Sequence, residues 1–174
     1  MARSGFRRVA SVTGLTVLAL FVLIQLVPYG WRHPNPPVVG DAPWPDEESA
    51  RIAHESCYSC HSNETNWPPY AYAAPTSWLV RYDVDHGRAK FNFSDWDRYQ
   101  DRADRAIDQV LAGNMPLSRY TLIHPGARLT ADERDALATA LDTMSRDERD
   151  SGSGSSGSGD GSGSDDSARG GGDG

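Results

Sequence analysis

The sequence predicts an all-α protein, with one N-terminal transmembrane helix followed by a small helical domain. Two observations carry this prediction. Residues 9–27 form a run of 19 residues without a charged side chain. Further along, apolar side chains recur at the three- and four-residue spacing of an amphipathic helix, and no alternating strand pattern competes with it. Once its ends are set aside, the chain has room for one domain.

The N-terminal segment, residues 1–30, fits a membrane anchor. A helix over the apolar run is roughly 28 Å long, close to the ~30 Å hydrocarbon core of a bilayer. Arg3, Arg7 and Arg8 precede the run, which predicts a cytoplasmic N-terminus and an exported remainder. A cleaved signal peptide is the alternative, but no A-x-A-like site follows the run. We therefore expect an uncleaved single-pass protein of the cytoplasmic membrane, with its domain on the periplasmic or extracellular side.

Two further segments flank the domain, which we expect to occupy residues 46–146. Residues 31–45 contain five prolines. Such a segment favours polyproline II and predicts a semi-rigid linker that holds the domain away from the membrane. Residues 147–174 are rich in Gly, Ser and Asp and cannot bury enough apolar surface to offset chain entropy, so we expect a disordered tail.

Four helices are expected in the domain, and the first two are short. One runs from Asp46 to Cys57, with acidic residues in its first turn where the helix dipole favours them. The other runs from Ser77 to His86 and is expected to stop at Gly87.

The third and fourth helices have the clearest signals. Ser94 is a natural N-cap for the third, and Gly113 lies where a helix end takes left-handed backbone. Its predicted buried stripe is Trp96, Tyr99, Ala103, Ala106, Ile107, Val110 and Leu111. Thr130 and Glu133 form a capping box that opens the fourth helix. Its predicted buried face is Ala136, Leu137, Ala140, Leu141 and Met144. This core is small for the length of the domain, which leaves space for a bound group.

The charge distribution excludes one class of partner. From residue 31 onward the chain has 14 basic and 24 acidic residues. An acidic body repels phosphate backbones, so no nucleic-acid partner is expected. Lys90 is the single lysine beside 16 arginines, and the sequence assigns it no function.

The strongest chemical signal is C-Y-S-C-H at residues 57–61, a C-x-x-C-H motif typical of covalent haem attachment. Cys57 and Cys60 can form thioethers with the two vinyl groups of one porphyrin, and His61 can supply the proximal imidazole. A thioredoxin-like thiol pair would need a βαβ surround, which is not visible. A zinc site with His54 and His61 is the other alternative, but it lacks the usual second C-x-x-C or H-x-x-x-H. We therefore expect one haem c, with its iron bound by His61.

Met115 is the expected sixth ligand of the iron. It lies on no helical stripe, and Pro116 pushes its backbone towards an extended conformation. A thioether in such a loop can reach an iron from the side opposite His61. His/Met ligation raises the reduction potential relative to bis-histidine ligation, which suits electron transfer.

Other residues stay open as ligands or neighbours of the haem. His124 is the main rival of Met115, and His86 and His54 are weaker ones. A missing sixth ligand would permit peroxidase-like chemistry or gas binding. Met144 fits the stripe of the last helix and is expected in the core. The aromatic residues that could either pack on the porphyrin or belong to the core are Trp67, Trp78 and Trp96.

The chain resembles a bacterial family of haem-binding domain proteins that carry one N-terminal membrane helix. The stretches that carry the resemblance are residues 57–65, 67–68, 74–79, 87–88, 92–94 with Trp96, 115–117 and 120–125. It covers about residues 35–144 and implies a cytochrome-c-like helical domain wrapped around one haem. It also implies attachment at Cys57 and Cys60, an axial His61, and Met115 in the position of the distal methionine.

We expect a one-electron carrier rather than an enzyme. Two alternatives remain, a haem enzyme or gas or redox sensor with an open sixth site, and a zinc-stabilised interaction module. The acidic surface favours basic redox partners, whose identity the sequence does not give.

Overall fold

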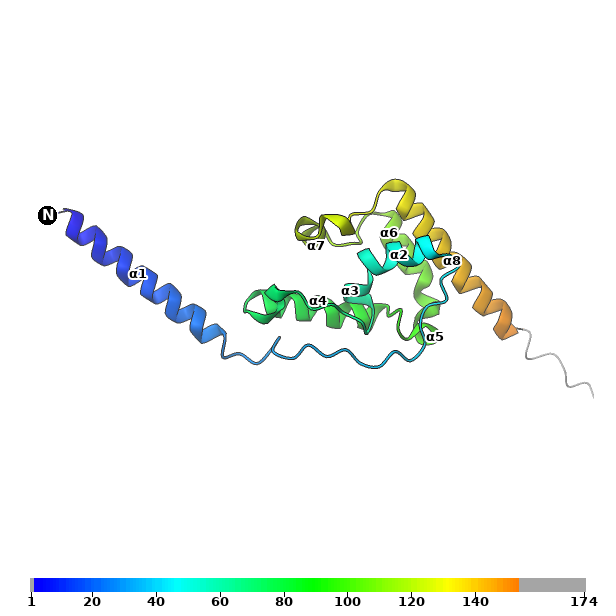
Figure 1. The fold of residues 1–174 in the computed structure, drawn as a ribbon, viewed down its shortest axis with the longest axis horizontal. Helices are drawn as coiled ribbons and strands as arrows, with labels where there is room; N and C mark the ends of the chain where they lie inside the picture. Colours follow the sequence, from blue (N-terminus) through cyan, green and yellow to red (C-terminus); the bar gives the residue numbers. More distant parts are fainter. Residues whose placement is uncertain (1, 154–174) are drawn as a thin grey trace, which may run out of the picture.

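The computed structural model describes residues 2–153 of the 174. Within these residues the chain forms helices joined by loops, without a strand, so the predicted all-α fold is confirmed. Figure 1 shows α1 (Ala2–Ile24) standing away from a group of shorter helices, which the longer α8 (Ala131–Ser153) closes. α8 extends into the segment predicted as a disordered tail. The rest of that prediction, residues 154–174, lies outside the described residues.

α1 is long and apolar enough to cross a membrane. Its apolar stretch, Gly5–Ile24, has 20 residues, and no part of it is buried against the rest of the protein. A signal sequence near an N-terminus meets the same criteria of length and composition.

The proline-rich segment, residues 31–45, lies along the domain instead of holding it at a distance. It passes α4 (Thr76–Lys90) and reaches α5 (Trp96–Tyr99) (Figure 1). Its carbonyl oxygens accept hydrogen bonds from the domain, at Pro34 from Arg88 (2.9 Å) and at Pro37 from Asn63 (2.8 Å). Prolines lack N–H groups but keep their carbonyl oxygens, so such a segment binds well to side chains that donate. The predicted spacer is therefore corrected to a strap on the domain surface.

The first predicted helix is present as α2 (Glu47–Ser56), and a further short helix, α3 (Tyr58–His61), follows directly after Cys57. Asp46 is the N-cap of α2, and its carboxylate accepts a hydrogen bond from the Ser49 N–H (2.8 Å). Two acidic residues follow in the first turn, as the helix dipole favours.

α4 continues past Gly87, where the sequence predicted its end. It gains three more residues and stops where Phe91 turns to extended backbone (φ −158°). A Cβ at position 87 would overlap the backbone carbonyl group of Cys60. Gly87 therefore allows the close crossing of α4 and α3 and does not terminate the helix.

The third predicted helix is interrupted. α5 and a 3-10 turn (Gln100–Arg102) precede α6 (Ala103–Leu111). Asp95, and not Ser94, holds the N-cap position of α5. The Ser94 hydroxyl instead accepts a hydrogen bond from the N–H of Asn63 (3.0 Å), a partner that sequence spacing cannot reveal.

The end of α6 matches the prediction in part. Gly113 adopts the expected left-handed backbone (φ +70°). Leu111 was expected in the buried stripe but is half exposed, because it lies outside the face that α6 packs against α8.

The capping box at the start of α8 is confirmed. The Thr130 N–H donates to Glu133 Oε2 (2.8 Å), and the Glu133 N–H donates to Thr130 Oγ1 (3.2 Å). Ala136 is exposed, contrary to the prediction, because the neighbouring helices cover the side of α8 that carries Leu137 and Ala138. The predicted residues that are buried on α8 are Leu137, Ala140, Leu141 and Met144.

The apolar core lies where α8 packs against α6 and α2. α4 packs against α3 and against the helical turn Pro69–Tyr72. α7 (Ser118–Ile123) lies at the edge of the domain nearest to α1 (Figure 1). Residues from α4, α6 and α8 line a space beside α3, where the C-x-x-C-H motif is found.

Candidate functional site

The C-x-x-C-H motif forms one turn at the junction of α2 and α3. Cys57 ends α2 with a non-helical backbone (φ −123°, ψ −41°). Its carbonyl oxygen accepts hydrogen bonds from the N–H groups of Cys60 (3.1 Å) and His61 (2.9 Å). The two thiols and the imidazole are thus carried by a single short turn, as the motif predicts.

A cavity of about 720 Å³ lies beside this turn, a size typical of small-molecule and cofactor sites. Cys57, His61 and Met115 all line it, so three of the four predicted site residues meet in one space. Cys60 is half-buried and is not among the lining residues; its backbone carbonyl faces Gly87 of α4. The other lining residues are Ala89, Lys90, Phe91, Phe93, Arg102, Arg105, Ala106, Gln109, Val110, Leu137 and Leu141.

The His61 ring is oriented by the backbone. Its Nδ1 lies 2.9 Å from the carbonyl oxygen of Phe91. A carbonyl oxygen only accepts, so Nδ1 carries the proton and Nε2 keeps a free lone pair. Burial lowers the pKa of His61 below its usual 6.5, which keeps the ring neutral at pH 7. A neutral imidazole held through Nδ1 is the usual form of a metal-ligating histidine.

The thiols are not poised for redox exchange. Burial raises the pKa of Cys57 to about 12 and that of Cys60 to about 11. Thiol–disulfide enzymes need a lowered thiol pKa, because the thiolate is the nucleophile. The raised pKa values count against the thioredoxin-like alternative, and residues 2–153 contain no strand for the βαβ surround that it needs.

A polar network holds the chain that follows His61. The Asn92 side-chain amide donates to Asn63 Oδ1 (3.0 Å), and the Phe93 N–H donates to the His61 carbonyl oxygen (2.8 Å). Arg88 donates to the Ser62 carbonyl oxygen (2.7 Å) and also reaches the strap. The backbone on both sides of His61 is therefore fixed by hydrogen bonds as well as by packing.

Met115 lies in the loop after α6. Its N–H and that of Asn114 both donate to the Gln109 carbonyl oxygen (3.1 and 3.0 Å). Met144, the other candidate thioether in the domain, is buried in the apolar core as predicted.

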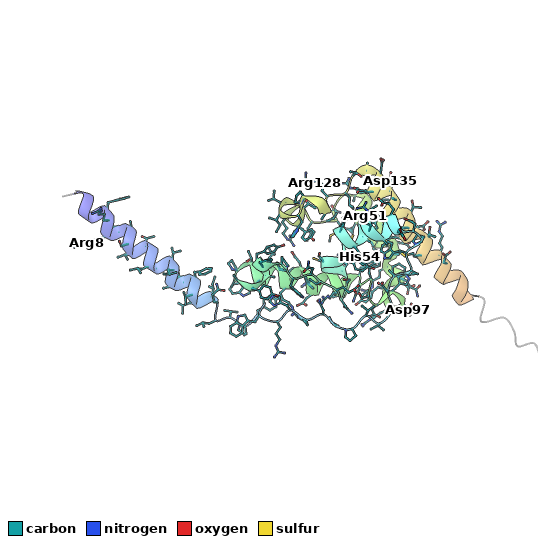
Figure 2. All side chains as sticks on the ribbon, in the orientation of Figure 1. Arg8, Arg51, His54, Asp97, Arg128 and Asp135 are labelled. Carbon is teal, nitrogen blue, oxygen red and sulfur yellow. The ribbon has the colours of Figure 1, made fainter. Side chains whose placement is uncertain are left out.

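The rival histidines have other partners. His124 Nε2 lies 2.5 Å from the hydroxyl of Tyr70, and its ring stacks on Tyr120. His86 stacks on Tyr82, and His54, on α2 (Figure 2), packs against the ring of Tyr58. None of the three lines the cavity.

The cavity wall also contains positive charge that the sequence analysis missed. Lys90, Arg102 and Arg105 line it together with Gln109, and no acidic side chain is among the lining residues. Arg102 also donates to the carbonyl oxygens of Ala89 and Lys90 (3.0 Å each). Lys90 is the single lysine of the sequence, but its position in the sequence alone does not indicate this role. An acidic protein with a basic cavity wall suits an anionic ligand.

Two further expectations concern the tryptophans and zinc. Trp96 belongs to the apolar core, Trp67 donates a hydrogen bond to Asn35 of the strap, and Trp78 lies on α4 beside a separate apolar hollow. None of the three lines the cavity. Across residues 2–153, no three or more side chains of the metal-binding types His, Cys, Asp and Glu gather into a site for a metal ion. The zinc alternative therefore lacks a ligand set in this part of the chain.

The chain matches a known protein family. The model of a family described as a haem-binding domain matches residues 19–143, well over half of the chain. The match includes the end of α1, the strap and the whole cavity. No curated protein and no solved structure matches the chain.

Proposed function

The chain belongs to the haem-binding domain family, and from this premise we propose that it is a membrane-anchored c-type cytochrome with one haem. It transfers single electrons at the outer face of the cytoplasmic membrane. The observation that carries the proposal is the meeting of Cys57, His61 and Met115 around one cavity.

In this proposal Cys57 and Cys60 attach the haem covalently. Each thiol adds across one vinyl group, with the sulfur bonded to one carbon and the hydrogen to the other, so no atom is lost and no oxidant is needed. The C-x-x-C spacing on one turn, and the position of Cys57 at the cavity, support this role.

His61 and Met115 would be the two protein ligands of the iron. The lone pair on His61 Nε2 is free because Nδ1 donates to Phe91. A bound haem supplies a ferric–ferrous couple, and a His/Met pair that stays in place in both states favours electron transfer over ligand exchange. The apolar side chains that α6 and α8 contribute to the cavity would pack against the group; they are Ala106, Val110, Leu137 and Leu141.

Lys90, Arg102 and Arg105 suit the two carboxylates of a haem. Charge-assisted hydrogen bonds to carboxylates are about twice as strong as neutral ones. The cationic part of the wall would therefore set which edge of the haem enters first and which edge stays near the charged side chains.

The proposed topology is the one that the arginines before the apolar span predict. Arg7 and Arg8 stay in the cytoplasm, α1 remains in the membrane as an uncleaved anchor, and the domain lies on the periplasmic or extracellular side. Covalent attachment of haem c on the outer side of the membrane fits this arrangement.

The decisive experiment is an absorption spectrum of the full chain, exported in cells that contain the haem-attachment machinery. We expect a sharp reduced α-band that survives acid–acetone extraction, and a weak far-red ferric band from methionine ligation. A colourless, folded, membrane-bound protein would refute the proposal. Rapid carbon monoxide binding to the reduced form would replace electron transfer with an open-site enzyme or sensor.

A further inference from the structure

One face of α4 is apolar and exposed, next to the end of α1. Pro75, Trp78, Leu79 and Tyr82 recur at helical spacing, and with Val27 and Tyr29 they line a shallow apolar hollow. Leu79 and Tyr82 are 46% and 49% exposed. Such a stripe normally packs against another helix, but no helix of the described residues covers it.

The stripe is held in place relative to α1 by specific contacts. The Gln25 side chain donates to the Ala74 carbonyl oxygen (3.0 Å) and accepts from the Ala74 N–H (2.9 Å). Gly30 has a positive φ of 85° and lies so close to Ser77 that a Cβ would approach its carbonyl carbon to 2.9 Å. The chain therefore leaves α1 and turns directly onto the start of α4, without a free linker.

α7 provides a second apolar surface at the same end of the domain. Figure 1 shows α7 and the first turns of α4 on the side that faces α1. Leu122 and Ile123, at the end of α7, are 78% and 57% exposed. Side chains of this size and exposure are unfavourable in water, and two neighbouring ones suggest a contact surface.

We infer that the α4 stripe and the end of α7 together form a membrane seat, which rests on the phospholipid surface into which α1 is inserted. Tyr29 and Trp31 follow the apolar span directly, at the depth where aromatic side chains favour the lipid interface. The stripe packs beside Tyr29, so it reaches the same depth, and its own Trp78 and Tyr82 have the composition of such a belt. The lipid bilayer that surrounds α1 is therefore the surface that covers the seat. This inference rests on the proposed membrane anchoring and not on the haem.

The test uses the full chain in lipid nanodiscs of phosphatidylethanolamine and phosphatidylglycerol. A photoreactive diazirine amino acid replaces one residue at a time, at the positions of Tyr82 and Leu122 in the seat. Leu15 in α1 is the positive control. Val39, 79% exposed on the strap, is the matched control, because its N–H binds Ser94 near α5, at the end of the domain away from α1 (Figure 1). Asp97 marks the same end in Figure 2.

After illumination, mass spectrometry counts the lipid adducts. We expect yields at positions 82 and 122 that are close to the yield at 15 and roughly tenfold above that at 39. Adducts at 15 without adducts at 82 and 122 would overturn the seat and leave the anchor intact. No adducts at 15 would overturn the anchor and the seat together. Cross-links from position 82 or 122 to another protein, instead of to lipid, would also overturn the seat in favour of a protein partner. The haem spectrum of the same samples reports separately on the proposed cytochrome.

Discussion

The two walls of the cavity are held by different forces. The His61 wall consists of α3 with residues 62–65 and 89–94, and side-chain and backbone hydrogen bonds fix it. The Met115 wall consists of α6, α8 and residues 112–117, and it is mainly apolar packing around Val110, Leu137 and Leu141. Hydrogen bonds set the direction of a side chain, whereas packing sets a shape and tolerates adjustment. The fold therefore fixes His61, the proposed proximal ligand, more firmly than Met115, the proposed distal one.

The largest effect is expected on the His61 wall. His61→Ala removes the only imidazole that lines the cavity, so we expect loss of haem from the exported protein. His124→Ala is the matched control, because it removes a histidine bonded to Tyr70 outside the cavity and should keep the haem. The measurement is haem absorbance per protein after export. If both variants keep their haem, the proximal role of His61 is wrong.

The next effect tests the Met115 wall. Met115→Ala should keep the covalent haem, lose the far-red ferric band and lower the reduction potential. The expected drop is a few tenths of the ~0.8 V range over which axial ligands set haem potentials. Met144→Leu, in the apolar core, should leave both unchanged. Redox titration of the two variants gives the comparison. An unchanged potential in Met115→Ala would move the sixth ligand elsewhere.

The third effect returns to the His61 wall and its packing against α4. Gly87→Ala places a Cβ against the Cys60 carbonyl group, and neither backbone can move without shifting a whole helix. We expect a loss of about 3 kcal/mol in the free energy of unfolding. Gly126→Ala is the control, because nothing lies within 4 Å of its added Cβ. Denaturant unfolding checks both; equal stability of the two variants would contradict the close crossing.

The sequence predicted those features that depend on neighbouring residues. The C-x-x-C-H turn and the capping box of Thr130 and Glu133 are local, so their spacing alone indicates their geometry. Gly87 and Ser94 were misassigned because each serves a partner far along the chain, Cys60 and Asn63. A glycine that stops a helix and one that lets two helices touch look the same in a single sequence.

The strap and the basic residues of the cavity were missed for the same physical reason. A proline-rich segment is stiff and extended whether it is free or bound, and only the domain decides which of its carbonyl oxygens find donors. Lys90, Arg102 and Arg105 come from three different elements: α4, the 3-10 turn Gln100–Arg102 and α6. They meet only when the chain folds. Their sequence neighbours include acids, which hides the local excess of positive charge.

A smaller effect is expected at the start of the Met115 wall. Thr130→Ala removes the side-chain half of the capping box and should cost about 1 kcal/mol. The hydrogen bonds from Thr130 lower the pKa of Glu133 below its usual 4.5. The contribution of the Glu133 carboxylate to the free energy of unfolding is therefore present above pH 4.5 and is lost as the pH falls through its lowered pKa. We expect the difference in free energy of unfolding between wild type and Thr130→Ala to be smaller at pH 3 than at pH 7. An equal difference at the two pH values would contradict the pairing of Thr130 with Glu133.

The smallest effect tests the charges that both walls contribute. Lys90→Gln comes from the His61 wall and Arg105→Gln from the Met115 wall, and each removes a positive charge that lines the cavity. A nearby positive charge disfavours the ferric state, so each change should lower the reduction potential, by about 30 mV for a charge roughly 10 Å from the iron at an intermediate dielectric constant. Arg98→Gln is the control, because its side chain is 74% exposed and does not line the cavity. Because the side chains of Lys90 and Arg105 are exposed, salt should reduce both shifts. At low ionic strength, shifts no larger than that of Arg98→Gln would show that these two cations do not act on the carboxylates of a bound haem.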